Sequence, residues 1–234
     1  MQARRVAVWL GMCAISMVTS VNLEAQTAAP GATAPPATAP AATLDPKLVG
    51  NRFSPLTWAE MNEAQRTMMR HVLDGPRTAA GGPFNVMLRS PVIGDLAQEL
   101  GAQVRFNSSL PAALREMAIL MSARHWTAHY EWQAHKSAAL TAGLDPAIIA
   151  ALAAGERPRS LSPAETALYD FCSELLATKQ VGDATFAAAK AAFGEQGVTE
   201  VIFTLGYYGL VSMLLNVDEY PLPEGVQPEL QPLP

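Results

Sequence analysis

Residues 110–143 read LPAALREMAILMSARHWTAHYEWQAHKSAALTAG, and this stretch decides the fold. Pro111 suits the first turn of a helix, and mostly strong helix formers follow it as far as Arg124. A second run of helix formers extends from about Ala128 to Ala142 and ends at Gly143, the residue type that most often terminates helices. The stretch therefore predicts two helices joined by a short turn.

Similar start and stop signals recur along the rest of the chain. Capping boxes at residues 57–60 and 162–165 predict helices that extend to Leu73 and Lys179. The other predicted helices cover residues 92–100, 146–154, 183–193 and 198–216. The last of these is rich in β-branched and aromatic residues, but its length favours a helix over a strand. We predict an all-α fold of about eight helices.

The first 25 residues have the pattern of a secretory signal peptide. Two arginines, Arg4 and Arg5, precede an apolar run over residues 6–21, and Ala25 offers a small residue for cleavage. The run is shorter than the roughly 20 residues that a membrane-spanning helix needs. We therefore expect a secreted or periplasmic protein without a stable membrane span once the signal is removed.

Two proline-rich segments flank the predicted helices. Residues 26–49 contain five prolines and eight alanines and predict a disordered linker, and residues 221–234 contain five prolines and predict a similar tail. From Gln26 to Pro46 the linker has no large apolar residue except Leu44, which is too little for a packed core. The sequence thus predicts a signal peptide at 1–25, a linker at 26–49, a helical domain at 50–220 and a tail at 221–234.

Charge and cysteine content exclude several classes of protein. The 16 basic and 21 acidic residues give a net charge of −5, which argues against a nucleic-acid-binding protein. Cys13 lies in the predicted signal peptide, so Cys172 is the only thiol expected in the exported chain. A protein with one cysteine has no internal disulfide and must be stabilised by packing.

The chemically richest part of the chain is the predicted helix pair at residues 110–143. Three of the four histidines, His125, His129 and His135, fall within eleven residues. Glu131 and His135 are four residues apart, so their side chains can meet on one helix face. A carboxylate beside an imidazole orients the ring and raises its pKa, as general acids and bases require. Glu116, on the preceding helix, joins this group if the two helices form a hairpin.

Two plainer interpretations remain open. The Glu131–His135 pair can be a solvated pair that contributes about 0.2–0.5 kcal/mol to helix stability. His125 and His129 have the spacing of a helical metal pair, but a third ligand at Glu131 or His135 would lie on a divergent face. These two histidines also fit a polar role at the turn between the helices.

Residues 110–143 resemble the carboxymuconolactone decarboxylase and alkylhydroperoxidase-D family. The shared features are an Arg-Glu pair in the first helix, a turn, Tyr-Glu-Trp-x-x-His, and a glycine eight residues later; Gly206-Tyr207-Tyr208 resembles the end of the decarboxylase-like branch. The resemblance covers most of residues 54–225. It implies a small all-α bundle that assembles into trimers or hexamers, and it implies no metal and no other cofactor.

The chain departs from the thiol-dependent branch of that family at two positions. The branch carries a Cys-x-x-Cys pair where this sequence has Ala128 and Glu131, so we expect no thiol peroxidase activity. The decarboxylase branch implies cofactor-free loss of CO₂ from a lactone diacid, with His135 as proton donor, tuned by Glu131 and Glu116.

The same resemblance suggests how a substrate would be held. Arg115 and Arg124 are candidate anchors for substrate carboxylates. For Trp132 and Tyr208, packing in the core or at a subunit interface is the favoured interpretation, and both are also candidate substrate contacts.

Three hypotheses of different classes follow. The first is a cofactor-independent lyase or isomerase that acts on a small lactone or cyclic carboxylate through Glu116, Glu131 and His135. The second is a non-catalytic protein that binds a small acid or aromatic ligand in the same pocket. The third is an oligomeric scaffold in which the polar cluster only satisfies a buried helix crossing. A cavity at the cluster favours the first two.

Overall fold

A computed structural model describes residues 46–77 and 80–232. The predicted signal peptide and most of the predicted linker lie outside these residues. Within them the chain forms eight helices and no strand, which confirms the predicted all-α class. The helices are α1 (Glu63–Asp74), α2 (Phe84–Met87), α3 (Pro91–Phe106), α4 (Ala112–His125), α5 (His129–Thr141), α6 (Pro146–Ala154), α7 (Pro163–Thr178) and α8 (Asp183–Asp218).

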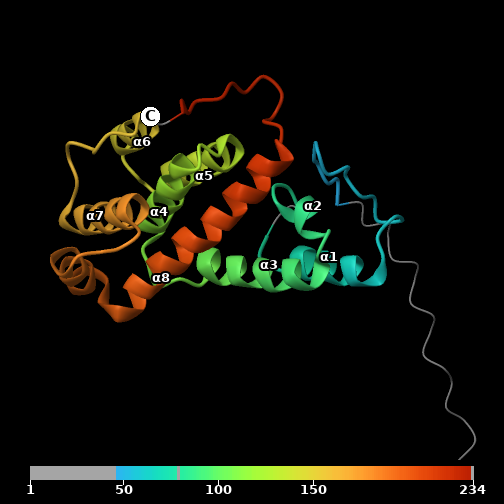
Figure 1. Ribbon diagram of the computed structural model, residues 1–234, viewed down its shortest axis with the longest axis horizontal. Helices are drawn as coiled ribbons and strands as arrows, with labels where there is room; N and C mark the ends of the chain where they lie inside the picture. The colour runs from blue at the N-terminus through green and yellow to red at the C-terminus, as the bar shows by residue number, and fades with distance from the viewer. Residues whose placement is uncertain (1–45, 78–79, 233–234) are drawn as a thin grey trace, which may run out of the picture. The chain divides into compact units, whose positions relative to one another are not determined.

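Helix α4 is the centre of the domain. It packs against α5, α6, α7 and α8, and Figure 1 shows α4 and α5 side by side with α8 running past them. Met117, Ala118, Ile119 and Leu120, four consecutive residues of α4, are all fully buried. A helix with apolar residues on every side has to be enclosed by other elements. The Ala, Leu and Met residues of this segment therefore place α4 in the core.

Helix α8 is long because two predicted helices are joined. Gly194 has a left-handed backbone conformation (φ 67°) and forms a kink between the parts predicted at 183–193 and 198–216. By length and composition, α8 is the one helix among the described residues that could cross a membrane. However, 56% of its most apolar window is buried against the rest of the domain, as expected of a core helix in a soluble fold.

Two helix starts differ from the sequence prediction. Helix α1 begins at Glu63 rather than near residue 57, because Asn62 and Gln65 form the capping box that starts it. At Thr57 only half of the predicted box forms. The Glu60 carboxylate accepts from the Thr57 N–H and hydroxyl, whereas the Glu60 N–H donates to the Thr57 carbonyl and closes a turn. The short helix α2 was not predicted, because its apolar residues form a single turn without capping side chains.

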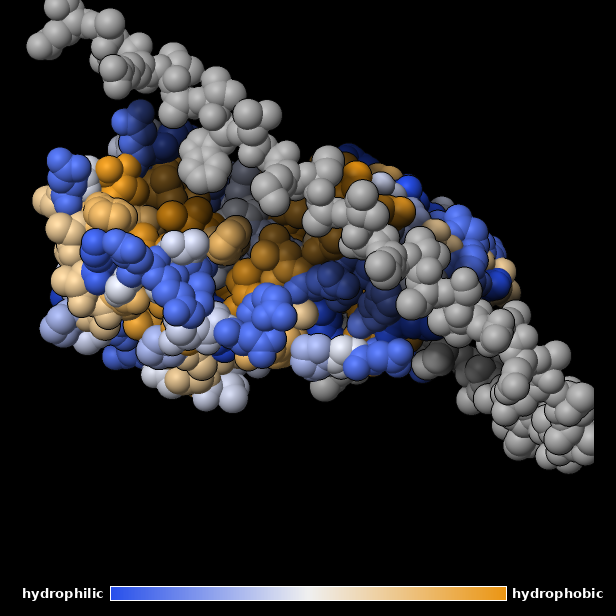
Figure 2. Space-filling model, turned by 90° about the horizontal axis from the view of Figure 1, so that it is seen from below, coloured by the Kyte–Doolittle hydropathy of each residue, from blue (hydrophilic) through white to orange (hydrophobic). Residues whose placement is uncertain are grey.

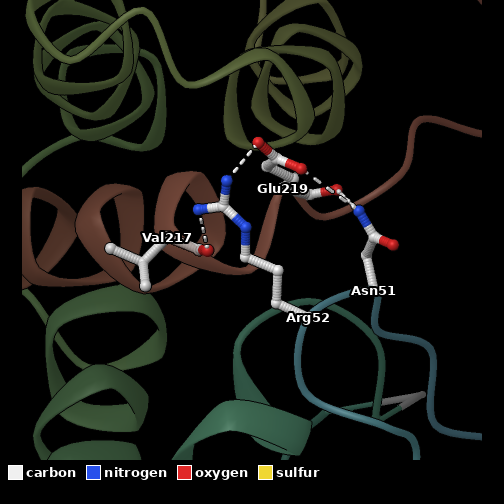
Figure 3. Close-up of polar contacts among 4 residues, drawn as sticks. All are labelled: Asn51, Arg52, Val217 and Glu219. Atoms are coloured by element: carbon white, nitrogen blue, oxygen red, sulfur yellow. Dashed lines mark hydrogen bonds and ion pairs between the residues drawn. The ribbon is translucent and has the colours of Figure 1, made fainter.

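The segment before α1 is held against the C-terminal end of α8. Figure 3 shows Arg52 donating hydrogen bonds to the Val217 carbonyl (3.0 Å) and to the Glu219 carboxylate (2.5 Å). The buried carboxylate of Asp218 accepts hydrogen bonds from the backbone N–H groups of Asn51 and Phe53. These contacts fix the start of the domain on the end of its longest helix.

The proline-rich C-terminal segment also packs on the domain. It has no helix or strand, yet Leu230 is buried in the main hydrophobic core. The Glu229 carboxylate accepts hydrogen bonds from Trp132 (3.1 Å) and Lys136 (2.7 Å), both on α5. The segment therefore covers α5 instead of extending freely, which its proline content alone did not indicate.

Candidate acid–base site

The α4–α5 hairpin brings two carboxylates to the two nitrogens of one imidazole. Nδ1 of His135 lies 2.6 Å from Oε2 of Glu116 on α4. Nε2 of His135 lies 3.0 Å from Oε1 of Glu131, one turn earlier on α5. The ring thus lies between a carboxylate from each helix of the hairpin, and we call these three residues the triad.

The triad is removed from water. Glu116, Glu131 and His135 are 5%, 4% and 4% exposed, so the interpretation as a solvated pair is wrong. Burial alone lowers the pKa of His135, but the charge of Glu131 and hydrogen bonds to both carboxylates outweigh it and raise the pKa to about 9. The imidazole is therefore protonated at neutral pH and donates a hydrogen bond to each carboxylate.

A cavity of about 420 Å³ opens beside the triad. Its wall includes Arg77, Arg105, Tyr130, Glu131, His135 and Tyr208. The volume suits a small organic molecule, and the wall combines two cations with aromatic rings and an acid–base pair. A cavity of this kind is not expected where a polar cluster serves only to satisfy a helix crossing.

Aromatic rings shape the inner part of this cavity. The Tyr208 ring packs edge-on against the His135 ring, with centroids 4.8 Å apart. Burial and the nearby Glu131 charge raise the pKa of Tyr208 well above its usual value. Burial, together with Tyr220 and Glu131, raises the pKa of Tyr130 to about 12. Both phenols therefore stay neutral and can donate hydrogen bonds to a ligand.

Glu116 lines a second, shallower hollow. This hollow is lined by residues of α4 and α5, among them Arg115, Ser137 and Thr141. Glu131 belongs to the wall of the first cavity, whereas Glu116 belongs to the wall of this one. The imidazole thus links two carboxylates that lie at different hollows.

The other sequence-predicted substrate contacts are placed differently. Of the four, Tyr208 lines the triad cavity, whereas Arg115, Arg124 and Trp132 do not. Arg124 is buried at the end of α4, where desolvation lowers its pKa, and its Nη1 lies 3.5 Å from the Thr127 hydroxyl. Trp132 is buried, with its indole N–H bonded to Glu229.

Two arginines that the sequence did not single out line the cavity instead. Arg77 follows α1 and stacks over the Phe84 ring at 5.2 Å, and Arg105 ends α3 and stacks over the Phe106 ring at 5.3 Å. Neither lies in the helix hairpin that carries the triad. The only sequence signal was an arginine close to a phenylalanine, which is too common to identify a site.

The histidine pair His125 and His129 does not share a helix. His125 is the last residue of α4 and His129 the first of α5, with a turn between them. The spacing of four residues therefore lacks the helical geometry on which the metal-pair interpretation depended. In the described part of the chain, Cys172 is a buried thiol of the core, and burial raises its pKa far above the usual range.

These helices and this triad define an all-helical protein with a buried acid–base site in a helix hairpin. Residues 91–174 match the sequence model of the Carboxymuconolactone decarboxylase family, so this part of the chain is similar to that family. The match includes Glu116, Glu131 and His135 and confirms the resemblance found in the sequence. A search of curated proteins found no match.

Proposed function

We propose that the protein is an acid–base enzyme, a cofactor-independent lyase or isomerase acting on a small lactone or cyclic carboxylate in the triad cavity. The observation that carries this proposal is the buried imidazolium of His135, bonded to two carboxylates at the wall of a cavity that also contains two arginines. Buried, closely coupled titratable groups in a cavity are characteristic of catalytic sites.

The arginines would bind the substrate by its carboxylate groups. Arg77 and Arg105 are the cations of the cavity wall, and a guanidinium group can form two parallel hydrogen bonds to a carboxylate. Their stacking on Phe84 and Phe106 limits the orientations of both side chains. The rings of Tyr130 and Tyr208 would pack on the apolar part of a cyclic ligand.

Proton transfer to the substrate would pass through Glu131. Both nitrogens of His135 already contact carboxylates, whereas Glu131 lines the cavity. In a decarboxylation, the C–C bond to the carboxylate breaks, its electron pair enters the adjacent unsaturated system and CO₂ leaves. The Glu131 carboxylate takes the Nε2 proton of His135 and passes it to the carbon. Glu131 is then a carboxylate again, and the neutral His135 regains a proton from water when the product leaves.

A turnover screen on the purified protein tests this function. Lactones and unsaturated cyclic acids are incubated with the protein, and products are identified by mass spectrometry. We expect loss of CO₂ or isomerisation with the wild type, and at least a hundredfold lower kcat for Glu131→Gln, a variant that keeps the size of the side chain. Arg77→Gln should raise KM more than it lowers kcat, whereas the matched control Arg70→Gln, on the surface of α1, should behave as the wild type.

The alternative function is binding without catalysis. The cavity and its two arginines would equally suit a protein that carries a small cyclic acid. Ligand-induced thermal stabilisation that requires Arg77 and Arg105, without turnover of any compound, would favour this alternative. If no compound is turned over and none raises Tm, both functions are contradicted.

We further propose that the protein is exported and acts as a homo-oligomer, a trimer or hexamer. On α3, Val92, Ile93 and Leu96 are 65–70% exposed, and Figure 2 shows apolar side chains on one face of the molecule. On α8, Phe203 and Leu210 are exposed and seven residues apart, a spacing that suits packing against another helix. We expect a second copy of the chain to cover these residues, because packing of the same helices from two copies buries the apolar side chains on both.

Oligomerisation and export have separate tests. Light scattering coupled to size exclusion should give an oligomer for the wild type and a smaller species for Phe203→Glu/Leu210→Glu, while Lys190→Glu, elsewhere on α8, changes nothing. A wild type that is monomeric at micromolar concentration would contradict the interface. Export predicts a secreted or periplasmic chain that begins near Gln26, which intact-mass measurement of the fractionated protein detects.

A further inference from the structure

We propose that His71, Asp95 and Glu99 form a binding site for a divalent transition-metal ion, with Zn²⁺ as the best-suited ion. The site lies where α1 packs against α3, and its three residues are not part of the triad-cavity wall. His71 is in the last turn of α1, and Asp95 and Glu99 are one turn apart on α3. Residues four apart present their side chains on the same helix face, so the two carboxylates face the imidazole together.

The three side chains are already close enough to share an ion. One ligand atom of each lies within 4.8 Å of the ligand atoms of the other two. Zinc bonds to nitrogen and oxygen of about 2.0–2.2 Å place neighbouring ligands roughly 3.4 Å apart. The side chains of His71 and Glu99 reach toward solvent and can close the remaining distance by rotation about their own bonds.

A buried amide holds one of these ligands in place. Oδ1 of Asp95 accepts a hydrogen bond of 3.0 Å from Nε2 of Gln98, a side chain only 2% exposed. The other oxygen, Oδ2, lies 2.7 Å from Nδ1 of His71. Metal-binding carboxylates are typically oriented by such a second hydrogen bond. An ordinary surface ion pair would not require a buried partner behind the carboxylate.

The surroundings favour a cation. His71, Asp74 and Glu99 line a hollow of about 600 Å³, and no lysine or arginine is among the described residues of its wall. One imidazole with two carboxylates is a mixed nitrogen and oxygen set, which suits Zn²⁺ or Mn²⁺ better than the all-oxygen sites of Mg²⁺. Three protein ligands leave positions for water, so we expect binding weaker than at a closed structural zinc site.

Calorimetric titration of the metal-free, untagged protein with Zn²⁺ tests this site. We expect one strong site per chain, at least tenfold weaker binding of Mg²⁺, and at least tenfold weaker binding of Zn²⁺ by Glu99→Gln and by His71→Gln. Glu63→Gln removes an exposed carboxylate elsewhere on α1 and is the matched control, with unchanged affinity. Zn²⁺ should also raise Tm in the wild type and in Glu63→Gln, but not in Glu99→Gln.

Two results would overturn the proposal. The first is the absence of Zn²⁺ binding to the wild type. The second is binding of equal affinity by the wild type, Glu99→Gln and His71→Gln, which would place the ion on other residues, such as the remaining histidines. Because both substitutions are at solvent-exposed side chains, their unliganded Tm should equal that of the wild type, and this measurement separates loss of the site from loss of the fold.

Discussion

The stability of the protein should fall steeply with rising pH because of His135. Its imidazole is buried between Glu116 and Glu131 at 2.6 and 3.0 Å, and its folded-state pKa is about 9, compared with 6.5 for an unperturbed histidine. Below pH 6.5 both states bind the proton, and the stabilisation by the two carboxylates is fully present. Between these values only the folded state keeps the proton, so the free energy of unfolding decreases as pH rises.

The size of the effect follows from the two pKa values. One proton held only by the folded state gives a slope of about −1.4 kcal/mol per pH unit. A window from 6.5 to about 9 then corresponds to a loss of about 3 kcal/mol, a large part of the roughly 5–15 kcal/mol typical of a domain. Above pH 9 the imidazole is neutral in both states, and its contribution to the slope disappears.

Urea denaturation at a series of pH values measures this loss. The matched control is Glu116→Gln/Glu131→Gln, which preserves the shapes around His135 but removes both charges. In this variant burial lowers the pKa of His135, so the proton is not retained and the curve should be flat from pH 6.5 to 9. The difference between the two proteins cancels shared groups that lie outside the triad's field, such as Cys172, whose pKa burial raises.

A wild-type curve that is as flat as that of the double variant would refute the reasoning. It would mean that His135 is neutral when folded, and that the two short contacts are hydrogen bonds of an uncharged ring. A steep fall in both proteins would instead assign the pH dependence to a group outside the triad.

Three further predictions concern packing. Gly101→Ala should lower the free energy of unfolding by about 1–3 kcal/mol in urea, because a Cβ there would lie 2.1 Å from the Tyr207 hydroxyl; a neutral effect would mean that α3 and α8 separate easily. Leu230→Ala should cost about 2–5 kcal/mol in the same assay if the C-terminal segment is part of the core, and nothing if it is detached. Asp218→Asn should speed amide hydrogen exchange at Phe53, whose N–H now donates to the carboxylate at 2.8 Å, while exchange within α4 stays unchanged; equal rates at Phe53 would contradict the anchoring role.

The sequence predicted the parts of the fold that depend on local signals. Pro111, Gly143 and the box at Ser162 mark helix ends that the structure places within a residue or two of the prediction. The predicted start of α1 was wrong because two capping-box patterns lie close together, at Thr57 and at Asn62. Only the one at Asn62 forms both of its bonds, whereas at Thr57 the Glu60 carboxylate accepts from the Thr57 N–H and hydroxyl and the Glu60 N–H donates to the Thr57 carbonyl. Only packing of the following segment decides which box starts a helix, and packing is not a local property.

The candidate site also has one part that local sequence signals predicted and another part that they did not. Glu131 and His135 are one helical turn apart, and Glu116 is on the adjoining helix, so short-range geometry sufficed to group them. Arg77 follows α1 and Arg105 lies in the last turn of α3, and they reach the cavity only because α1 packs on α3 and α3 packs on α8. Docking of separate helices, which no spacing rule describes, determines the charge of the cavity wall.

The carboxylate at position 131 determines whether this site is better suited to donate a proton or to remove one. With a pKa of about 9, His135 is neutral in only about one molecule in a hundred at pH 7, so the resting triad holds a proton that it can give rather than a free base that can take one. Glu131 therefore favours reactions that end with protonation of a carbanion, as decarboxylation does, over reactions that begin with proton abstraction. The two arginines are consistent with that order, because they would bind the anionic substrate before its charge is redistributed.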